Sequence, residues 1–485
     1  MQKILPYFPK LFIYFSILFA CVIYGLVFSL KWKIGSAILF LLIMLIVNLY
    51  SLELGILPVF FTIPLDRLGK ITPDSGITFA KIFIALLIFA WVIRVLLTKD
   101  YKPITLLKES PLAILAFLFI TFSLCSVINA RELDIFMGQN VRRISCVILF
   151  FLIINIVRRT NFLIRILGVI LLVYIGIGFV GLYEIHSGQS ILKTVWGEEE
   201  VQLAYTLNSG AFRIGGPGGD PDFLAISVIF PTLIAAMFLY MVRSKFLKIL
   251  LVLFILLMLT NMIATGSRGG LGSLMIGVAV FWYFAQMKRK YLIFFLGAVL
   301  LVSLILVSTL ISPSMPTERY TSGGGGKSII YRIGWSQMAF SMIRDHPIIG
   351  IGTGNFPIQY PKYSRDIPEV PREPYWTHNS FLQSWAENGI FGSLVYFAIF
   401  LVSARMMLTV VKNSGDPTLK SLALLLLSVL TAYFFFAATS NVLENENYWI
   451  VFAFITIVYH LFKNELYASS ASRVFFNGLP NQRSF

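Results

Sequence analysis

The feature of this sequence that most limits its fold is a series of long apolar blocks separated by short polar segments. Residues 11–30, 291–311 and 419–438 are examples, and each is long enough to cross a hydrocarbon core of about 30 Å as a helix. Within lipid the backbone must satisfy its own hydrogen bonds, which an α-helix does inside one segment. The pattern therefore predicts an all-α protein, a polytopic transmembrane helical bundle with a large extracytoplasmic loop containing short interfacial helices.

The apolar blocks allow about 12–14 spans. The candidates are roughly residues 11–30, 35–50, 52–64, 77–97, 111–129, 138–157, 162–182, 222–242, 246–265, 271–287, 291–311, 389–411, 419–439 and 447–462. Segment 52–64 is short and contains Pro58, so it is either half of a broken helix or a re-entrant piece. Segment 11–30 has no small-residue cleavage site and is followed by further spans, which favours a membrane span over a cleavable signal peptide.

Composition and charge exclude a soluble nucleic-acid-binding protein. Hydrophobic residues make up 58% of the chain and charged residues only 13%, against about a quarter in a soluble domain. The formal net charge is +16, but the basic residues lie in short loops between apolar blocks, near residues 158, 245, 289 and 416. Such loops are typical of the cytoplasmic side of a membrane protein. The segments expected outside are 183–221, 266–270, 312–388 and 440–447.

We expect three parts in the chain. Residues 1–210 are N-terminal transmembrane helices, residues 211–462 are a catalytic transmembrane region that includes the outside loop 312–388, and residues 463–485 are a cytoplasmic tail. The outside loop is too long for a plain connector, and such loops are usually functional. Its segment Tyr331–Arg344 predicts an amphipathic helix on the membrane surface. The apolar residues at near-helical spacing in that segment are Ile333, Met338, Phe340 and Ile343.

The sequence offers little for a metal or a nucleotide. The cysteines all lie within apolar blocks, so we expect no disulfide and no metal cage; they are Cys21, Cys125 and Cys146. Gly215–Gly219 lacks the GxxxxGK[ST] pattern of a nucleotide-phosphate loop. Asp220-Pro221-Asp222 has the spacing of a metal-binding DxD, yet Asp followed by Pro also starts helices, and we favour the helix start. No metal and no cofactor are expected.

His378 is the strongest candidate for a catalytic residue. It lies in Trp376-Thr377-His378-Asn379-Ser380, at the end of the long outside loop and just before an apolar span. A general base should titrate near neutral pH, which histidine does without a large perturbation. The alternative is a histidine that only forms a hydrogen bond at the start of a helix, and residue type alone favours that alternative.

Three arginines are candidates for binding a phosphate or diphosphate outside the membrane. Arg268 lies in the tight turn Thr265–Gly270, where we expect glycines to expose backbone N–H groups beside a planar cation. Arg213 precedes Gly215–Gly219, and Arg332 lies in the expected interfacial helix; either can supply a second cation. Contact with lipid headgroups is the alternative for Arg268 and Arg332, but it does not account for the glycines around Arg268.

The residues after His378 have a distinctive spacing. His378-Asn379 is followed by nine residues and then by Gly389-Ile390-Phe391-Gly392. This pattern resembles that of the O-antigen ligase and O-antigen polymerase superfamily of bacterial envelope enzymes. Similar motifs over roughly residues 210–440 are Ser267–Gly270, Arg332 with Trp335, and Asp345-His346-Pro347 leading to Gly350–Phe356.

The resemblance implies a metal-independent, inverting glycosyltransferase in the bacterial inner (plasma) membrane, with its active site facing the outside. The donor is then a glycan on undecaprenyl pyrophosphate, and the partners are this lipid-linked oligosaccharide, a glycan or lipid acceptor and membrane lipids, with no nucleic acid. His378 would activate the acceptor hydroxyl. Arg268 and Arg332 would bind the leaving pyrophosphate, with Arg213 and Asn379 as further substrate-binding residues.

The acceptor stays open at this stage. A ligase transfers the glycan to the lipid A core, a polymerase to another lipid-linked repeat, and some relatives glycosylate proteins. The short segment after residue 462 favours the first two. A flippase for lipid-linked oligosaccharide is a further alternative, but it would require cations facing a central cavity and repeated halves. A non-catalytic scaffold would not require His378.

Overall fold

The computed structural model describes residues 33–65, 68–69, 78–98, 110–196, 213–286, 297, 325–365, 367, 370–371 and 373–477. Nine helices in these residues are apolar and long enough to cross a membrane. Three shorter apolar helical stretches accompany them. The chain is therefore a polytopic helical bundle, as its apolar blocks predicted. The expected spans 11–30 and 291–311, apart from residue 297, lie outside the described residues.

The chain divides into two compact units, Met1–Lys102 and Pro103–Phe485. In the first unit, α2 (Lys33–Tyr50) packs against α5 (Phe79–Thr98). Between them the chain forms only short helical pieces, which are α3 (Leu52–Gly55), α4 (Leu57–Thr62) and η2 (Ile63–Leu65). Ser51 caps α3, and Pro58 lies in the first turn of α4, where its missing N–H costs no hydrogen bond. Segment 52–64 is thus a series of short helical pieces and not one continuous span.

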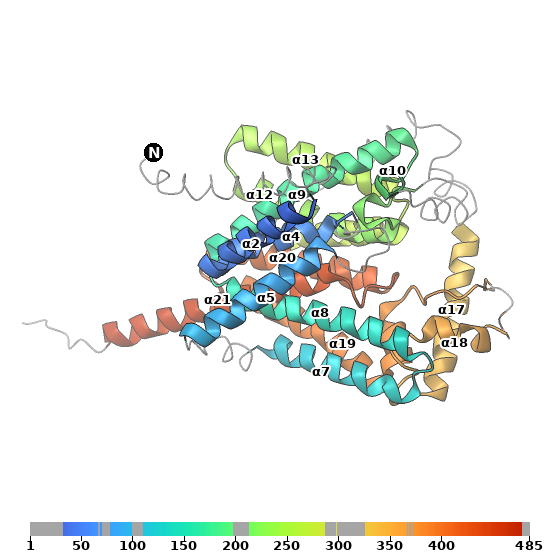
Figure 1. Ribbon diagram of the computed structural model, residues 1–485. Helices are drawn as coiled ribbons and strands as arrows, with labels where there is room; N and C mark the ends of the chain where they lie inside the picture. The colour runs from blue at the N-terminus through green and yellow to red at the C-terminus, as the bar shows by residue number, and fades with distance from the viewer. Residues whose placement is uncertain are drawn as a thin grey trace, which may run out of the picture. The chain divides into compact units, whose positions relative to one another are not determined.

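The second unit contains the remaining apolar helices of the bundle. In chain order they are α7 (Pro111–Cys125), α8 (Leu133–Ile156), α9 (Thr160–Ser187), α12 (Pro221–Met241), α13 (Lys245–Ala264), α14 (Arg268–Phe284), α19 (Ser380–Asn413), α20 (Pro417–Ala437) and α21 (Glu446–Asn477). In α12 and α20, 72% of an 18-residue stretch is buried, against 28% in α13, so α12 and α20 lie at the centre of the unit. Helix α19 packs between α7 and α20 (Figure 1).

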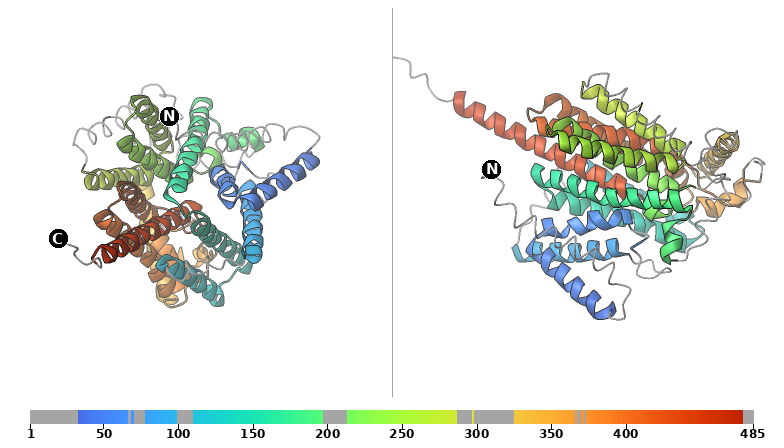
Figure 2. Two further views of the ribbon diagram at one scale, coloured as in Figure 1. Left: turned by 90° about the vertical axis from the view of Figure 1, so that its left-hand side faces the viewer. Right: turned by 90° about the horizontal axis from the view of Figure 1, so that it is seen from above.

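One end of the second unit collects the links expected outside the membrane. Helices α17 (Gly325–Asp345) and α18 (Phe356–Tyr363) lie at this end, and α21 runs past the bundle at the other (Figure 2). Hydrogen bonds join the links here: Asn129 Nδ2 donates to the Gly350 carbonyl oxygen at 2.7 Å. The opposite helix ends are basic: Arg158, Arg159 and Arg243 lie in the links there, and Lys245 and Lys412 lie in the adjoining turns of α13 and α19. This arrangement agrees with the charge alternation along the sequence.

Helix α17 is present where the sequence predicted a helix, but its buried face is different. Met338 and Ile343 pack in a core with residues of the following loop, α18 and α19. Ile333 and Phe340, expected on the same apolar face, are 55% and 54% exposed. The reason is that α17 packs onto folded protein, so tertiary contacts decide which residues it buries.

Helix α19 begins nine residues before the expected span 389–411. The extra residues include polar side chains, which lower the hydropathy of the segment and so concealed the helix. They are nevertheless buried, and they include Gln383, Ser384, Glu387 and Asn388. Burial of polar groups requires partners, and these partners lie next to the candidate site.

Candidate functional site

The start of α12 contributes two carboxylates with different roles. Asp220 is the N-cap, and its Oδ1 accepts hydrogen bonds from the backbone N–H groups of Asp222 at 2.8 Å and Phe223 at 2.9 Å. This is the helix-start role that the sequence favoured over a metal ligand. Asp222 faces Arg213, whose Nη2 lies 3.2 Å from Asp222 Oδ1. Arg213 Nε also donates to the Thr265 carbonyl oxygen at 2.6 Å, which joins the start of α12 to the start of α14.

A buried carboxylate fixes the backbone beside Arg213. Glu184, in α9, is fully buried, and its Oε2 accepts from the backbone N–H groups of Gly215 at 3.1 Å and Gly216 at 2.8 Å. Its Oε1 accepts from the Ile191 N–H at 2.8 Å. These bonds compensate the cost of burying the carboxylate. The glycine stretch is therefore anchored to α9, which holds Arg213 in place.

Arg268 is the first residue of α14, and its side chain is exposed. Ser267 caps this helix by accepting the Gly270 N–H at 3.3 Å. A Cβ added to Gly269 would lie 2.5 Å from Thr439 Oγ1 in the α20–α21 link. The glycines therefore allow the start of α14 to pack closely against its neighbours. The expectation that they expose backbone N–H groups to a ligand stays a prediction.

Helix α17 brings a third arginine to the same place. Arg332 is half-buried and interacts electrostatically with Asp222, Arg213 and Arg268. Loss of hydration lowers the pKa of Arg332; Asp222 opposes this shift, and the two neighbouring arginines add to it. Arg213 and Arg332, from distant parts of the sequence, thus interact with one carboxylate, and Arg268 interacts with Arg332.

His378 lies at this cluster in an uncommon backbone conformation. Its φ of 52° is in the left-handed region, which few residues other than glycine adopt. Its ring centroid lies 5.1 Å from that of Trp335 and 5.2 Å from that of Tyr375. It also interacts electrostatically with Asp222. Such a conformation persists only where its surroundings fix it, and it is frequent at functional sites.

The rings around His378 form a fixed wall. Trp335 is buried, and its Nε1 donates to the Tyr360 hydroxyl oxygen at 3.1 Å. That hydroxyl donates in turn to the Pro371 carbonyl oxygen at 2.9 Å. Tyr375 stacks on Trp335 with ring centroids 5.1 Å apart and an angle of 16° between the planes. Helix α17 therefore positions His378 as well as Arg332.

Asn379 is the N-cap of α19. Its Oδ1 accepts from the backbone N–H groups of Phe381 at 3.0 Å and Leu382 at 3.1 Å. The next residue, Ser380, donates its hydroxyl hydrogen to the Ser440 carbonyl oxygen at 2.7 Å. The sequence suggested Asn379 as a substrate ligand, and the structure gives its oxygen a local role in starting the helix that follows His378.

The glycine motif after His378 marks a break in α19. Gly389 has φ 70° and ψ −174°, which interrupts the helical hydrogen bonds. The loop after α17 replaces them: the Ile351 N–H donates to the Ala386 carbonyl oxygen at 2.8 Å, and the Gly352 N–H donates to that of Glu387 at 3.1 Å. The spacing from His378 to the glycines therefore reflects a short helical segment that is clamped by this loop.

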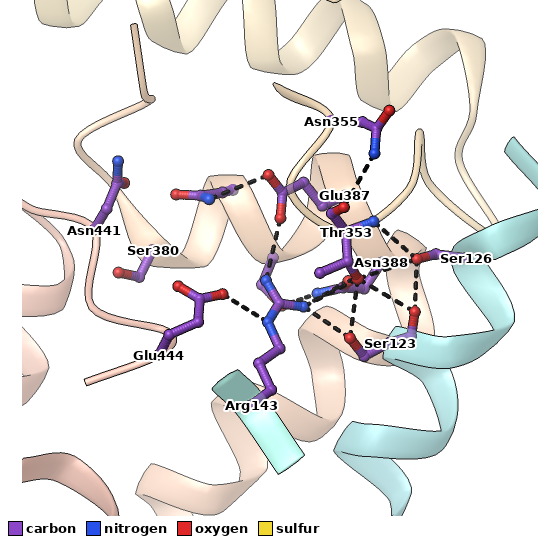
Figure 3. Close-up of polar contacts among 12 residues, drawn as sticks. Ser123, Ser126, Arg143, Thr353, Asn355, Ser380, Glu387, Asn388, Asn441 and Glu444 are labelled. Carbon is purple, nitrogen blue, oxygen red and sulfur yellow. Dashed lines mark hydrogen bonds and ion pairs between the residues drawn. The ribbon is translucent and has the colours of Figure 1, made fainter. Parts of the chain in front are cut away.

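A buried polar network beside the break was not expected from the sequence (Figure 3). Its centre is Arg143, in α8, whose side chain is fully buried. Arg143 Nη2 lies 3.1 Å from Glu387 Oε2, and Nε lies 2.7 Å from Glu444 Oε1. Nη1 donates to Ser123 Oγ at 2.9 Å, Asn388 Oδ1 at 2.9 Å and Thr353 Oγ1 at 3.2 Å. One signal was present: an arginine inside an apolar span usually has buried partners or a function.

The structure thus brings four of the five predicted residues to one cluster: Asp222 interacts with Arg213, Arg332 and His378, and Arg268 interacts with Arg332. Asn379 follows directly in the chain. The sequence weighed Asp222 only as a metal ligand or helix-start residue, and it gave no role to Tyr375. In chemical terms, the cluster places three guanidinium groups and a carboxylate near an imidazole.

One comparison with known proteins bears on this site. The family model described as O-antigen ligase matches residues 253–397. The matched segment begins within α13 and ends within α19, so it includes Arg268, Arg332 and His378, whereas Arg213 and Asp222 precede it. No curated protein matches the chain. The match confirms the resemblance that the spacing after His378 indicated.

Proposed function

We propose that this chain, whose residues 253–397 match the family model described as O-antigen ligase, is a membrane glycosyltransferase. It moves a glycan from a polyprenyl-pyrophosphate carrier to an acceptor hydroxyl at the outer face of the inner membrane. Neither a metal nor a nucleotide is required, because the diphosphate is already an activated leaving group.

One observation carries the proposal: three arginines and a histidine from four separate segments meet at the end of the bundle away from the basic links. Arg213 precedes α12, Arg268 begins α14, Arg332 lies on α17 and His378 precedes α19. Guanidinium groups bind phosphate oxygens in a planar, bidentate geometry that a lysine does not reproduce. The end of a membrane helix is also the depth at which the headgroup of a lipid-linked donor lies.

The proposed reaction is an inverting displacement. The acceptor oxygen forms a bond to the anomeric carbon as the bond from that carbon to the diphosphate oxygen breaks. The hydroxyl proton passes to His378, and the electron pair of the broken bond leaves with the polyprenyl diphosphate. The arginines stabilise the negative charge that develops on this leaving group, which is electrostatic catalysis by groups already in place. Attack from the face opposite the diphosphate inverts the anomeric configuration.

The reaction is the same whether the acceptor is the lipid A core, another lipid-linked repeat or a protein. Glycans from a deletion strain separate the first two: single repeats on the final acceptor indicate a missing polymerase, and long chains left on the carrier lipid indicate a missing ligase. A flippase is the alternative from another class. It would translocate the donor without consuming it, so the absence of transfer by purified protein that binds donor would favour it.

Variants of the two best-placed residues test the mechanism. His378→Ala should fold and bind the lipid-linked donor but lose turnover by about 10²–10⁴-fold, the usual contribution of a general base. His186→Ala is the matched control, because His186 is an exposed histidine at the end of α9. Arg268→Ala should weaken both donor binding and turnover, and Arg268→Lys should also be impaired because it loses the planar fork.

The readout is donor binding and glycan transfer measured on the same purified, lipid-reconstituted samples. Near-normal transfer by His378→Ala would exclude His378 as the general base. Normal donor binding by Arg268→Ala would remove Arg268 from the diphosphate site.

A further inference from the structure

Asp222 is an unexpected residue at a site for a diphosphate. A carboxylate repels an anionic ligand, and its partial burial costs hydration free energy. Its side chain is 29% exposed, and it faces the same cluster as the arginines. The charged groups around Asp222 give a reason for a carboxylate at this position.

Asp222 and Asp220 are separated by one residue, and both interact electrostatically with Arg213, but in the described residues only Asp222 forms an ion pair with it. Asp220 Oδ1 is engaged by the first backbone N–H groups of α12. Asp222 instead forms an ion pair with Arg213 at 3.2 Å and a side-chain hydrogen bond with Ser267. These contacts tie the segment before α12 to the cap of α14. Asp222 lies in the first turn of α12, but it does not cap the helix.

The remaining charged neighbours of Asp222 come from two further segments. Arg332, on α17, and His378, before α19, both interact with it electrostatically, and Arg268 and Arg213 interact with Arg332. The arginines oppose the gain of a positive charge on His378, whereas Asp222 favours it. A base that must accept a proton beside three cations requires such a counter-charge.

We propose that Asp222 is a positioning residue for the transfer reaction: it holds Arg213 against the start of α14 and stabilises the imidazolium that forms when His378 accepts the acceptor proton. This inference rests on the proposed function, because it assigns the counter-charge of the proposed base. It also gives a reason why a carboxylate lies among cations that bind an anion. The ring wall formed by Trp335 and Tyr375 is uncharged, so it does not take this role.

The test compares Asp222→Asn with Asp220→Asn. Asparagine at position 222 keeps the size of the side chain and a hydrogen-bond acceptor but removes the charge. Asparagine at position 220 caps a helix about as well as aspartate, so this control should transfer glycan within about twofold of the unmodified protein. Asp222→Asn should lower turnover by about 10–100-fold, the scale of a misplaced catalytic group. Its donor affinity should be unchanged or higher, because a charge that repels the diphosphate is gone.

The pH dependence of turnover distinguishes a counter-charge role of Asp222 from a purely structural role. Removing a carboxylate disfavours the imidazolium, so His378 should stay neutral to lower pH. The acid limb of the pH–rate profile should move down by about 0.5–1 pH unit in Asp222→Asn. Asp222→Glu keeps the charge, so its acid limb should stay in place even if its turnover falls.

A second readout does not depend on activity. Diethyl pyrocarbonate modifies neutral imidazole, so the yield of modified His378, measured by mass spectrometry against pH, reports its titration. The midpoint should fall in Asp222→Asn and stay unchanged in Asp220→Asn. An unchanged midpoint, or a drop in donor affinity that accounts for all lost activity, would overturn the role of Asp222. If the unmodified protein transfers no glycan but the midpoint of His378 modification falls in Asp222→Asn, the interaction between Asp222 and His378 is supported and the proposed function is refuted.

Discussion

Arg143 is the residue whose replacement should test the packing behind the site most directly. Its guanidinium group bonds to two carboxylates and three neutral side chains, which belong to α7, α19, the α17–α18 link and the α20–α21 link. Arg143→Met keeps an apolar stem of similar length and removes the charge. Glu387, whose side chain is 0% exposed, then stays behind without its cation.

The structure sets the expected loss of folding free energy in Arg143→Met. Breaking a buried ion pair by removing one partner costs about 3–5 kcal/mol, which is roughly a 10²–10⁴-fold change in the folding equilibrium. Glu444 is 21% exposed and can be rehydrated, and Glu387 Oε1 keeps the hydrogen bond from Gln383 Nε2 at 3.2 Å. Both facts place the expected cost near the lower end, at about 3 kcal/mol.

The assay is unfolding by SDS in mixed micelles, followed by tryptophan fluorescence. Arg142→Met is a matched control, because Arg142 precedes Arg143 in the same helix and is exposed; its change should be within about 0.5 kcal/mol. The double variant Arg143→Met/Glu387→Gln removes the stranded charge and should recover at least about 1 kcal/mol. Equal stability of Arg143→Met and Arg142→Met would refute the argument, and so would a double variant less stable than Arg143→Met alone.

Three further predictions follow from the fold. Gly389→Ala should lose more than about 2 kcal/mol of stability, because its Cβ would lie 1.9 Å from the Ile348 carbonyl oxygen at a φ of 70°; Gly272→Ala, with nothing within 4 Å of its Cβ, should be neutral or slightly stabilising in the same SDS titration. In intact cells, with the native cysteines replaced by serine, Glu373→Cys and Gln189→Cys should react with a membrane-impermeant thiol reagent and Asn413→Cys should not; the reverse pattern would invert the orientation. Glycan transfer by purified protein should survive EDTA, and activity lost to the chelator and restored by Mg²⁺ or Mn²⁺ would return Asp220 and Asp222 to consideration as metal ligands.

Local features of this protein could be predicted from the sequence because they depend on neighbouring residues. The apolar blocks predicted the helices, since a helix in lipid needs only its own backbone partners. Asp220 before Pro221 predicted the start of α12, and the cap lies where expected. The spacing from His378 to Gly389 pointed to a family that the match over residues 253–397 confirms.

The features that only the tertiary structure decided are those that depend on contacts between segments distant in the sequence. Arg143 lies 244 residues before Glu387 and 301 before Glu444, and no local pattern encodes such a pairing. The buried face of α17 depends on the loop and helices that cover it. Asp222 has the same residue type as Asp220, yet its carboxylate faces Arg213 and His378 because α12, α14, α17 and α19 meet there. The periodicity of apolar residues indicates which face of a segment contacts lipid or water. The partner of a buried charge is instead set by the packing of the whole bundle.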